Sequence, residues 1–197
     1  MKITIDNQEL DASAQTLGEA LVAAQKASEG RMVIRAEADG NEVPMQDLVN
    51  PPDTSPYASE INFHTVEPSH LVHETLYSAV DIIRGIKPKQ KEVSDLLLAG
   101  NVEPAKEQLM TLLSGWLDVN KTVQICTSSG HINKDAVASL DPSLDEMVLK
   151  LATDLNELRD ALTSSDFTAV SDLLAYEMMD QADQWSGLLT SLADSVR

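Results

Sequence analysis

The sequence predicts an α+β protein in which a small mixed domain precedes an antiparallel four-helix bundle. Short alternating segments separated by turn residues occupy residues 1–66. Beyond them, apolar residues recur at alternating steps of three and four, which is the period of a helix packed along one face. This helical part repeats its pattern, because Ala79 and the positions after it match Leu144 and its successors in register. We therefore expect two similar helical hairpins.

Composition narrows the class of protein before any motif is considered. The chain has 197 residues, 43% of them hydrophobic, which is enough to bury a sizeable core. Its 32 acidic and 14 basic side chains give a formal net charge of −18, which argues against nucleic-acid binding because phosphates need clustered cations. The single cysteine, Cys126, rules out an intramolecular disulfide. No apolar run suits a membrane span or a signal peptide, so we expect a cytoplasmic protein that does not bind membranes.

The mixed domain, residues 1–66, opens with a predicted hairpin and a helix. Residues 2–6 alternate polar and apolar side chains, and Leu10 and Ala12 continue the alternation on a returning strand. Thr16 is followed three positions later by Glu19, the spacing of a capping box at the start of a helix. We therefore expect a strand pair followed by a helix.

The rest of this domain reads as strands joined by turns. Residues 31–38 form a predicted strand, and the Asp-Gly pair at 39–40 predicts a hairpin turn into residues 41–43. Three prolines exclude a helix or a central strand from residues 50–60. Residues 61–66 alternate again as a final strand.

This order of strand–strand–helix–strand–strand–strand resembles the β-grasp, or ubiquitin-like, fold. Sulfur-carrier and ubiquitin-type members of that group end in a reactive Gly-Gly tail. Here Glu67-Pro68-Ser69 continues into a helix instead. The resemblance therefore implies a platform that contacts other proteins, without carrier chemistry.

Residues 67–197 form the predicted bundle, with hairpins at about 70–126 and 143–196. Pro88 should kink or split the first helix because it removes an amide donor. The clearest apolar seam, spaced 3, 4, 3, 4, 3, 4, 3, comprises Val102, Ala105, Leu109, Leu112, Trp116, Val119, Val123 and Cys126.

The two hairpins differ in their last helix. Glu177 and Gln181 stand where the first hairpin has apolar residues, and an extra four-residue step there is a stutter that rotates the apolar face. The scarcity of buried charge favours both side chains in solvent. The alternative places Glu177 near the interior as a ligand contact, with Gln90 and Tyr77 as neighbours. These three are the candidate ligand-binding residues.

No catalytic residue is predicted. The glycines are too scattered for a phosphate-binding loop, and no Gly-x-Ser-x-Gly elbow is present. Cys126 and His131 could pair as nucleophile and base, but Cys126 continues an apolar seam, which favours a buried structural thiol. We expect a protein that is not an enzyme and needs no cofactor.

One segment carries candidate metal ligands. His70, His73 and Glu74 share one helical face, so two imidazoles and a carboxylate could converge on an ion. Metal centres in helical bundles take a richer set of ligands from facing helices. The competing interpretation is a polar first turn after a Ser69 cap, and it is favoured.

Charged and bulky residues suggest surfaces for partners. Arg84, Lys87, Lys89 and Lys91 are either a solvated helix end or a patch for an acidic partner or a phosphate. Residues 135–197 hold 13 acidic and three basic side chains, a surface suited to a basic protein. The larger helical side chains either belong to the core or form an exposed groove that accepts the amphipathic helix of a client protein. They are Met110, Trp116, Tyr176, Met178, Met179 and Trp185.

Three functions compete. The first is a non-catalytic protein-interaction protein, an adaptor or chaperone, since in charge, size and helix content the chain is similar to cytosolic secretion and flagellar chaperones. The second is a helical bundle that binds a small molecule or a metal. The third, a membrane-surface protein, is disfavoured by the acidic charge. We favour the first and expect homodimerisation to accompany it.

Overall fold

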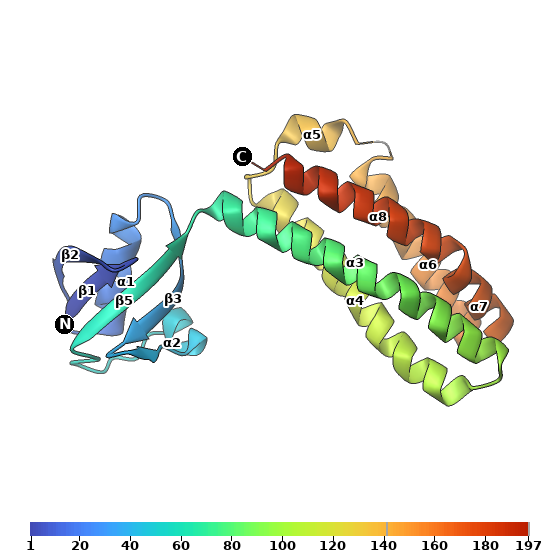
Figure 1. The fold of residues 1–197 in the computed structure, drawn as a ribbon, viewed down its shortest axis with the longest axis horizontal. Helices are drawn as coiled ribbons and strands as arrows, with labels where there is room; N and C mark the ends of the chain where they lie inside the picture. Colours follow the sequence, from blue (N-terminus) through green and yellow to red (C-terminus); the bar gives the residue numbers. More distant parts are fainter. Residues whose placement is uncertain (141, 197) are drawn as a thin grey trace. The chain divides into compact units, whose positions relative to one another are not determined.

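The computed structural model describes residues 1–140 and 142–196, apart from the side chains of residues 134 and 136. The fold is α+β, and the chain divides into two compact units, Met1–Leu71 and Val72–Arg197 (Figure 1). All five strands of the described residues belong to the first unit. Within that described part, no helix combines the length and apolar character needed to cross a bilayer.

A mixed five-stranded sheet forms the centre of the N-terminal unit. Its strand order is β2-β1-β5-β3-β4, with β1 and β5 parallel and the other neighbours antiparallel. This arrangement is compatible with the β-grasp-like start that the sequence predicts. The elements are β1 (Lys2–Ile5), β2 (Gln8–Ser13), α1 (Leu17–Ala27), β3 (Met32–Ala38), β4 (Asn41–Glu42), α2 (Met45–Val49) and β5 (Glu60–Val66).

The core of this unit lies between the sheet and α1. On β5 the alternation predicted from sequence is confirmed, because Ile61, Phe63 and Thr65 are buried and the residues between them are not. At the start of α1 the capping box is present: Glu19 N donates to Thr16 Oγ1 over 3.2 Å, and the Glu19 carboxylate accepts from Thr16 N over 3.4 Å. Local sequence therefore sets both elements.

One carboxylate joins the β3–β4 turn to the start of β5. Asp39 occupies the turn with a φ of 47°, and its side chain accepts hydrogen bonds from Ser59 N over 3.0 Å and Glu60 N over 3.0 Å. These backbone donors, Glu60 first and then Ser59, lower the pKa of Asp39. The turn predicted at the Asp-Gly pair is confirmed, whereas the short α2 that follows it was not predicted.

The C-terminal unit is helical and has one hydrophobic core. The predicted α4 seam is confirmed at seven of its eight positions, since all but Val102 are buried. Buried residues from the other long helices complete this core, and α6 packs against α7 and α8. The helices are α3 (Pro68–Leu98), α4 (Val102–Ser128), α5 (Lys134–Ala138), α6 (Leu144–Thr163), α7 (Phe167–Ala175) and α8 (Glu177–Asp194).

Two helices differ from the sequence-based expectation. Pro88 lies inside α3, which continues through it, so of the two predicted outcomes the split is wrong. The last helix, expected to be continuous with a stutter, is divided into α7 and α8 at Tyr176, whose φ of −118° and ψ of −73° depart from helical values. The buried stripe of α7 includes Val170 and Leu174, and the buried stripe of α8 begins at Met178. The apolar stripe therefore shifts at the break.

The approach of α3 to α4 depends on a glycine. A Cβ atom added at Gly115 would lie 2.9 Å from Ile86 Cδ1 and 3.6 Å from Ile82 Cγ2. The two helices pack closely at this point because Gly115 has no side chain.

Candidate functional site

A groove between α4 and α6, which we call the α4–α6 groove, is an apolar concavity of the helical unit. Its volume is about 320 Å³. Leu113 contributes from α4, and the α6 side chains are spaced at three and four residues, so that they project from one face. The groove is lined by Leu113, Leu155, Leu158, Arg159, Leu162 and Thr163.

Apolar side chains continue this surface along α4. Met110 precedes Leu113 by three residues and Leu117 follows it by four, so the three lie on the same side of the helix. Met110 is 69% exposed and Leu117 is 60% exposed. Fully burying one such side chain is worth about 1.5–3 kcal/mol. This face therefore gains stability when a partner covers it.

The charges beside the groove are of both signs. On α6 the Arg159 guanidinium contacts its neighbour Asp160, with Nη2 2.9 Å from Oδ1. Both side chains are largely exposed, and an exposed ion pair contributes little to stability. Arg159 therefore remains available to a carboxylate brought by a partner.

Beneath the surface, a chain of polar side chains connects α6 with α8. Lys150 Nζ lies 3.1 Å from Asp154 Oδ2, which also accepts a hydrogen bond from Gln181 Nε2 over 2.9 Å. Gln181 Oε1 in turn accepts from Trp185 Nε1 over 3.1 Å. Asp154 is 4% exposed, and both Gln181 and Trp185 are fully buried. Because each of these four side chains has a hydrogen-bonding or ionic partner within the network, the network holds the two helices in register.

The predicted ligand-binding residues do not gather in one place. Gln90 is buried and donates from Nε2 to the Met178 carbonyl over 3.1 Å. Tyr77 lies 13 residues earlier in α3, about 20 Å away at 1.5 Å per residue, and its hydroxyl donates to Asp194 Oδ1 over 3.1 Å. That hydrogen bond raises the pKa of Tyr77. Gln90 therefore lies beside the start of α8, where Glu177 stands, whereas Tyr77 lies at the other end of that helix.

Of the two polar residues at the stutter, Glu177 lies in solvent as favoured from the sequence, and Gln181 does not. Glu177 is exposed in the first turn of α8, so an interior position for its carboxylate is wrong. Gln181, which was expected in solvent, is fully buried because Asp154 and Trp185 provide hydrogen-bonding partners. The ligand-binding role of Glu177, Gln90 and Tyr77 stays a prediction.

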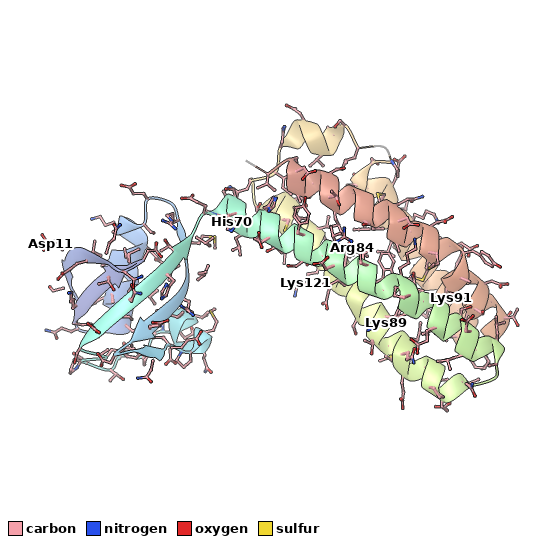
Figure 2. All side chains as sticks on the ribbon, viewed as in Figure 1. Asp11, His70, Arg84, Lys89, Lys91 and Lys121 are labelled. Atoms are coloured by element: carbon pink, nitrogen blue, oxygen red, sulfur yellow. The ribbon has the colours of Figure 1, made fainter. Side chains whose placement is uncertain are left out.

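The candidate metal ligands lie at the start of α3. The His73 ring lies 4.8 Å from the Tyr77 ring between centroids, and His73 Nδ1 is 3.9 Å from Glu74 Oε1. His70 lies one turn earlier on the same helix (Figure 2). Among the residues that the structure describes, no three His, Cys, Asp or Glu side chains form a group able to hold a metal ion. A metal role for His70, His73 and Glu74 therefore stays a prediction.

Cys126 is buried near the end of α4, as the sequence predicts. Burial raises the pKa of its thiol, which disfavours the nucleophilic thiolate.

The basic cluster around Pro88 is largely paired with carboxylates of the helical unit. Lys87 Nζ lies 2.6 Å from Asp183 Oδ1, while Arg84 and Lys91 pair with acidic residues of their own helix. Figure 2 labels Arg84, Lys89 and Lys91 along α3.

Of the six larger side chains weighed as core or groove, three lie in the core. Trp116, Trp185 and Met178 are fully buried, and the two indoles pack edge to face with their centroids 6.3 Å apart. Met110 and Tyr176 are exposed. The sequence analysis did not identify Leu113 or the α6 leucines as groove residues. The signal that was available is the position of Met110 and Leu117 outside the α4 seam.

Comparison with known proteins places the helical unit in a family. A family model described as a domain of unknown function (DUF8042) matches residues 74–188, which run from α3 into α8 and make up more than half of the chain. No curated protein matches the chain. No solved structure matches it either. The chain therefore belongs to the DUF8042 family of domains of unknown function.

Proposed function

We propose that this chain is a non-catalytic protein-interaction protein, an adaptor or chaperone, that holds an amphipathic helix of a partner protein on the α4–α6 groove. The observation that carries the proposal is the apolar groove of about 320 Å³, continued along α4 by Met110 and Leu117, which are 69% and 60% exposed. A helix laid in a groove presents apolar residues at steps of three and four, and the groove leucines have the same spacing.

We propose further that α3–α4 and α6–α8 are the two hairpins of an antiparallel four-helix bundle. Their shared hydrophobic core and the matched registers of the two hairpins support this arrangement. The α4–α6 groove then lies between helices of different hairpins. Within the first hairpin, Gly115 lets α3 approach α4 closely.

The chemistry of the groove supports binding rather than catalysis. Beside its four leucines it offers the Arg159 guanidinium and the Thr163 hydroxyl. Neither side chain is an acid or base that titrates near neutral pH. A guanidinium at the edge of an apolar groove suits orientation of a partner by an ion pair.

Site-specific photo-crosslinking tests this proposal. A photoreactive phenylalanine analogue at position 117 should give adducts in the cell, while the same analogue at position 98 should give few. Leu98 is 67% exposed on α3 and so matches Leu117 in exposure. Adding Met110→Asp should abolish the adducts at position 117. Equal labelling at both positions, no adduct at position 117, or adducts that survive Met110→Asp would contradict the proposal.

A further inference from the structure

The exposed face of α4 carries a second periodic pattern. Glu107, Met110, Ser114, Leu117 and Lys121 follow one another at steps of 3, 4, 3 and 4, and all five are exposed. We call these residues the α4 stripe. A stripe with this spacing along one face is the pattern of a helix that packs against another helix. The buried α4 seam already faces the core, so no helix among the described residues of this unit covers the α4 stripe.

We infer that the helix received by the α4–α6 groove is α4 of a second copy of this chain, packed antiparallel about a two-fold axis near Ser114. The inference rests on the proposed function and names the partner of that site. In such a two-fold pair every contact occurs twice: when one residue of the first copy contacts another residue of the second copy, the same two residues also meet with the copies exchanged.

The order of residues in the α4 stripe matches this antiparallel arrangement. Reversing the helix about Ser114 sets Glu107 opposite Lys121 of the second copy and brings Met110 within one residue of Leu117 of the second copy. Ser114 lies opposite itself, where its small side chain lets the helices approach closely. A parallel pair would instead set Glu107 against Glu107 and Lys121 against Lys121.

The two charged ends of the α4 stripe are available for such contacts. Within the part of the chain that the structure describes, neither Glu107 nor Lys121 forms an ion pair. Figure 2 labels Lys121 on α4. The symmetric pair would give each charge a partner of opposite sign, which the described residues of one copy do not provide.

Net charge also favours this face for self-association. Each copy carries a formal charge of −18, so two copies repel over most of their surfaces. Residues 72–134, which include α4, hold seven acidic and seven basic side chains, whereas residues 135–197 hold 13 acidic and three basic ones. The neutral hairpin is therefore the part of the helical unit that a second copy can approach at least electrostatic cost.

Sedimentation equilibrium over a range of concentrations tests the inference with the full chain. The wild type and Leu98→Asp should show a monomer–dimer equilibrium, while Leu117→Asp should remain a monomer with an unchanged circular dichroism spectrum. Lys121→Glu places like charges opposite each other twice and should raise the dimer Kd about tenfold. The swap Glu107→Lys/Lys121→Glu restores opposite charges and should return the Kd to within about threefold of the wild type.

Rescue by the swap distinguishes the antiparallel pair from other dimers, because a parallel pair would gain nothing from it. A wild type that stays monomeric, a Leu117→Asp dimer of unchanged affinity, or a swap that fails to rescue would overturn the inference. A monomeric wild type whose position-117 adducts hold a different protein overturns the second copy and leaves the proposed function standing. The absence of all adducts at position 117 overturns both.

Discussion

Trp185 Nε1 donates a hydrogen bond over 3.1 Å to Oε1 of Gln181, one turn earlier in α8, and both side chains are fully buried. The other end of the Gln181 amide donates to Asp154 on α6. A single side chain thus satisfies a buried indole and a buried carboxylate. The stability of the helical unit should depend on it.

Replacing Gln181 by leucine should lower the free energy of unfolding by about 2–4 kcal/mol, because Asp154 and Trp185 both lose a buried hydrogen-bonding partner. Trp116 and Trp185 are the chain's two tryptophans, so urea unfolding followed by fluorescence reports on the helical unit. The matched control is Gln184→Leu, at an exposed position three residues on, which should change stability by less than about 0.5 kcal/mol. Equal stability of the two variants would show that the hydrogen-bond network of Gln181 contributes nothing to the free energy of unfolding.

Gly115→Ala should destabilise the helical unit although alanine is the better helix former. The new Cβ would lie 2.9 Å from Ile86 Cδ1, which must move. Nothing lies within 4 Å of a Cβ added at Gly187 in α8, so Gly187→Ala should stabilise by about 0.5–1 kcal/mol. Ile86→Val removes the crowding methyl group and should make Gly115→Ala less costly in a double-mutant cycle. Additive effects would count against the close approach of α3 and α4.

The N-terminal unit should lose stability in acid through Asp6. Its carboxylate accepts hydrogen bonds from Thr65 Oγ1 over 2.6 Å and Thr65 N over 2.9 Å, and Arg31 lies 3.5 Å away. The Thr65 hydrogen bonds, helped by Arg31, lower the pKa of Asp6 in the folded state. Folding is therefore favoured by this carboxylate above its unfolded pKa of about 3.9, and the benefit disappears as the pH falls through the lower folded value.

Hydrogen exchange of peptides from residues 1–13 measures this dependence. Asp6→Asn should speed exchange at pH 7, and the difference from wild type should shrink as the pH falls below about 4 and vanish below the lowered folded pKa, where the wild-type carboxylate is neutral too. Glu9 is a suitable control, since it is exposed on β2 and its Glu9→Gln variant should exchange like the wild type. A difference that stays constant down to pH 2 would mean that Asp6 acts through something other than its charge.

The thiol of Cys126 should react slowly in the native protein. It is 2% exposed, and burial raises its pKa, so little thiolate is available at neutral pH. Labelling with a maleimide should therefore accelerate across the urea transition of the helical unit. Rapid labelling without urea would show that the end of α4 opens readily.

Local patterns in the sequence determined much of this protein. The α+β class, the capping box of Thr16 and Glu19, and the α4 seam follow from alternation, capping spacing and helical period, which depend on residues close together in the chain. The buried thiol of Cys126 followed from its place in that seam. These features need no knowledge of which helix lies beside which.

Only the tertiary structure decided the rest. Gln181 is buried because Asp154, 27 residues earlier, lies within hydrogen-bonding distance on another helix, and no spacing rule reveals that pairing. The break at Tyr176 and the groove beside Leu113 likewise depend on how neighbouring helices pack. A polar side chain is stable inside a core only when a neighbouring helix supplies a hydrogen-bonding partner. An apolar side chain remains at the surface when no neighbouring helix covers it. In both cases the neighbouring helix is distant in sequence.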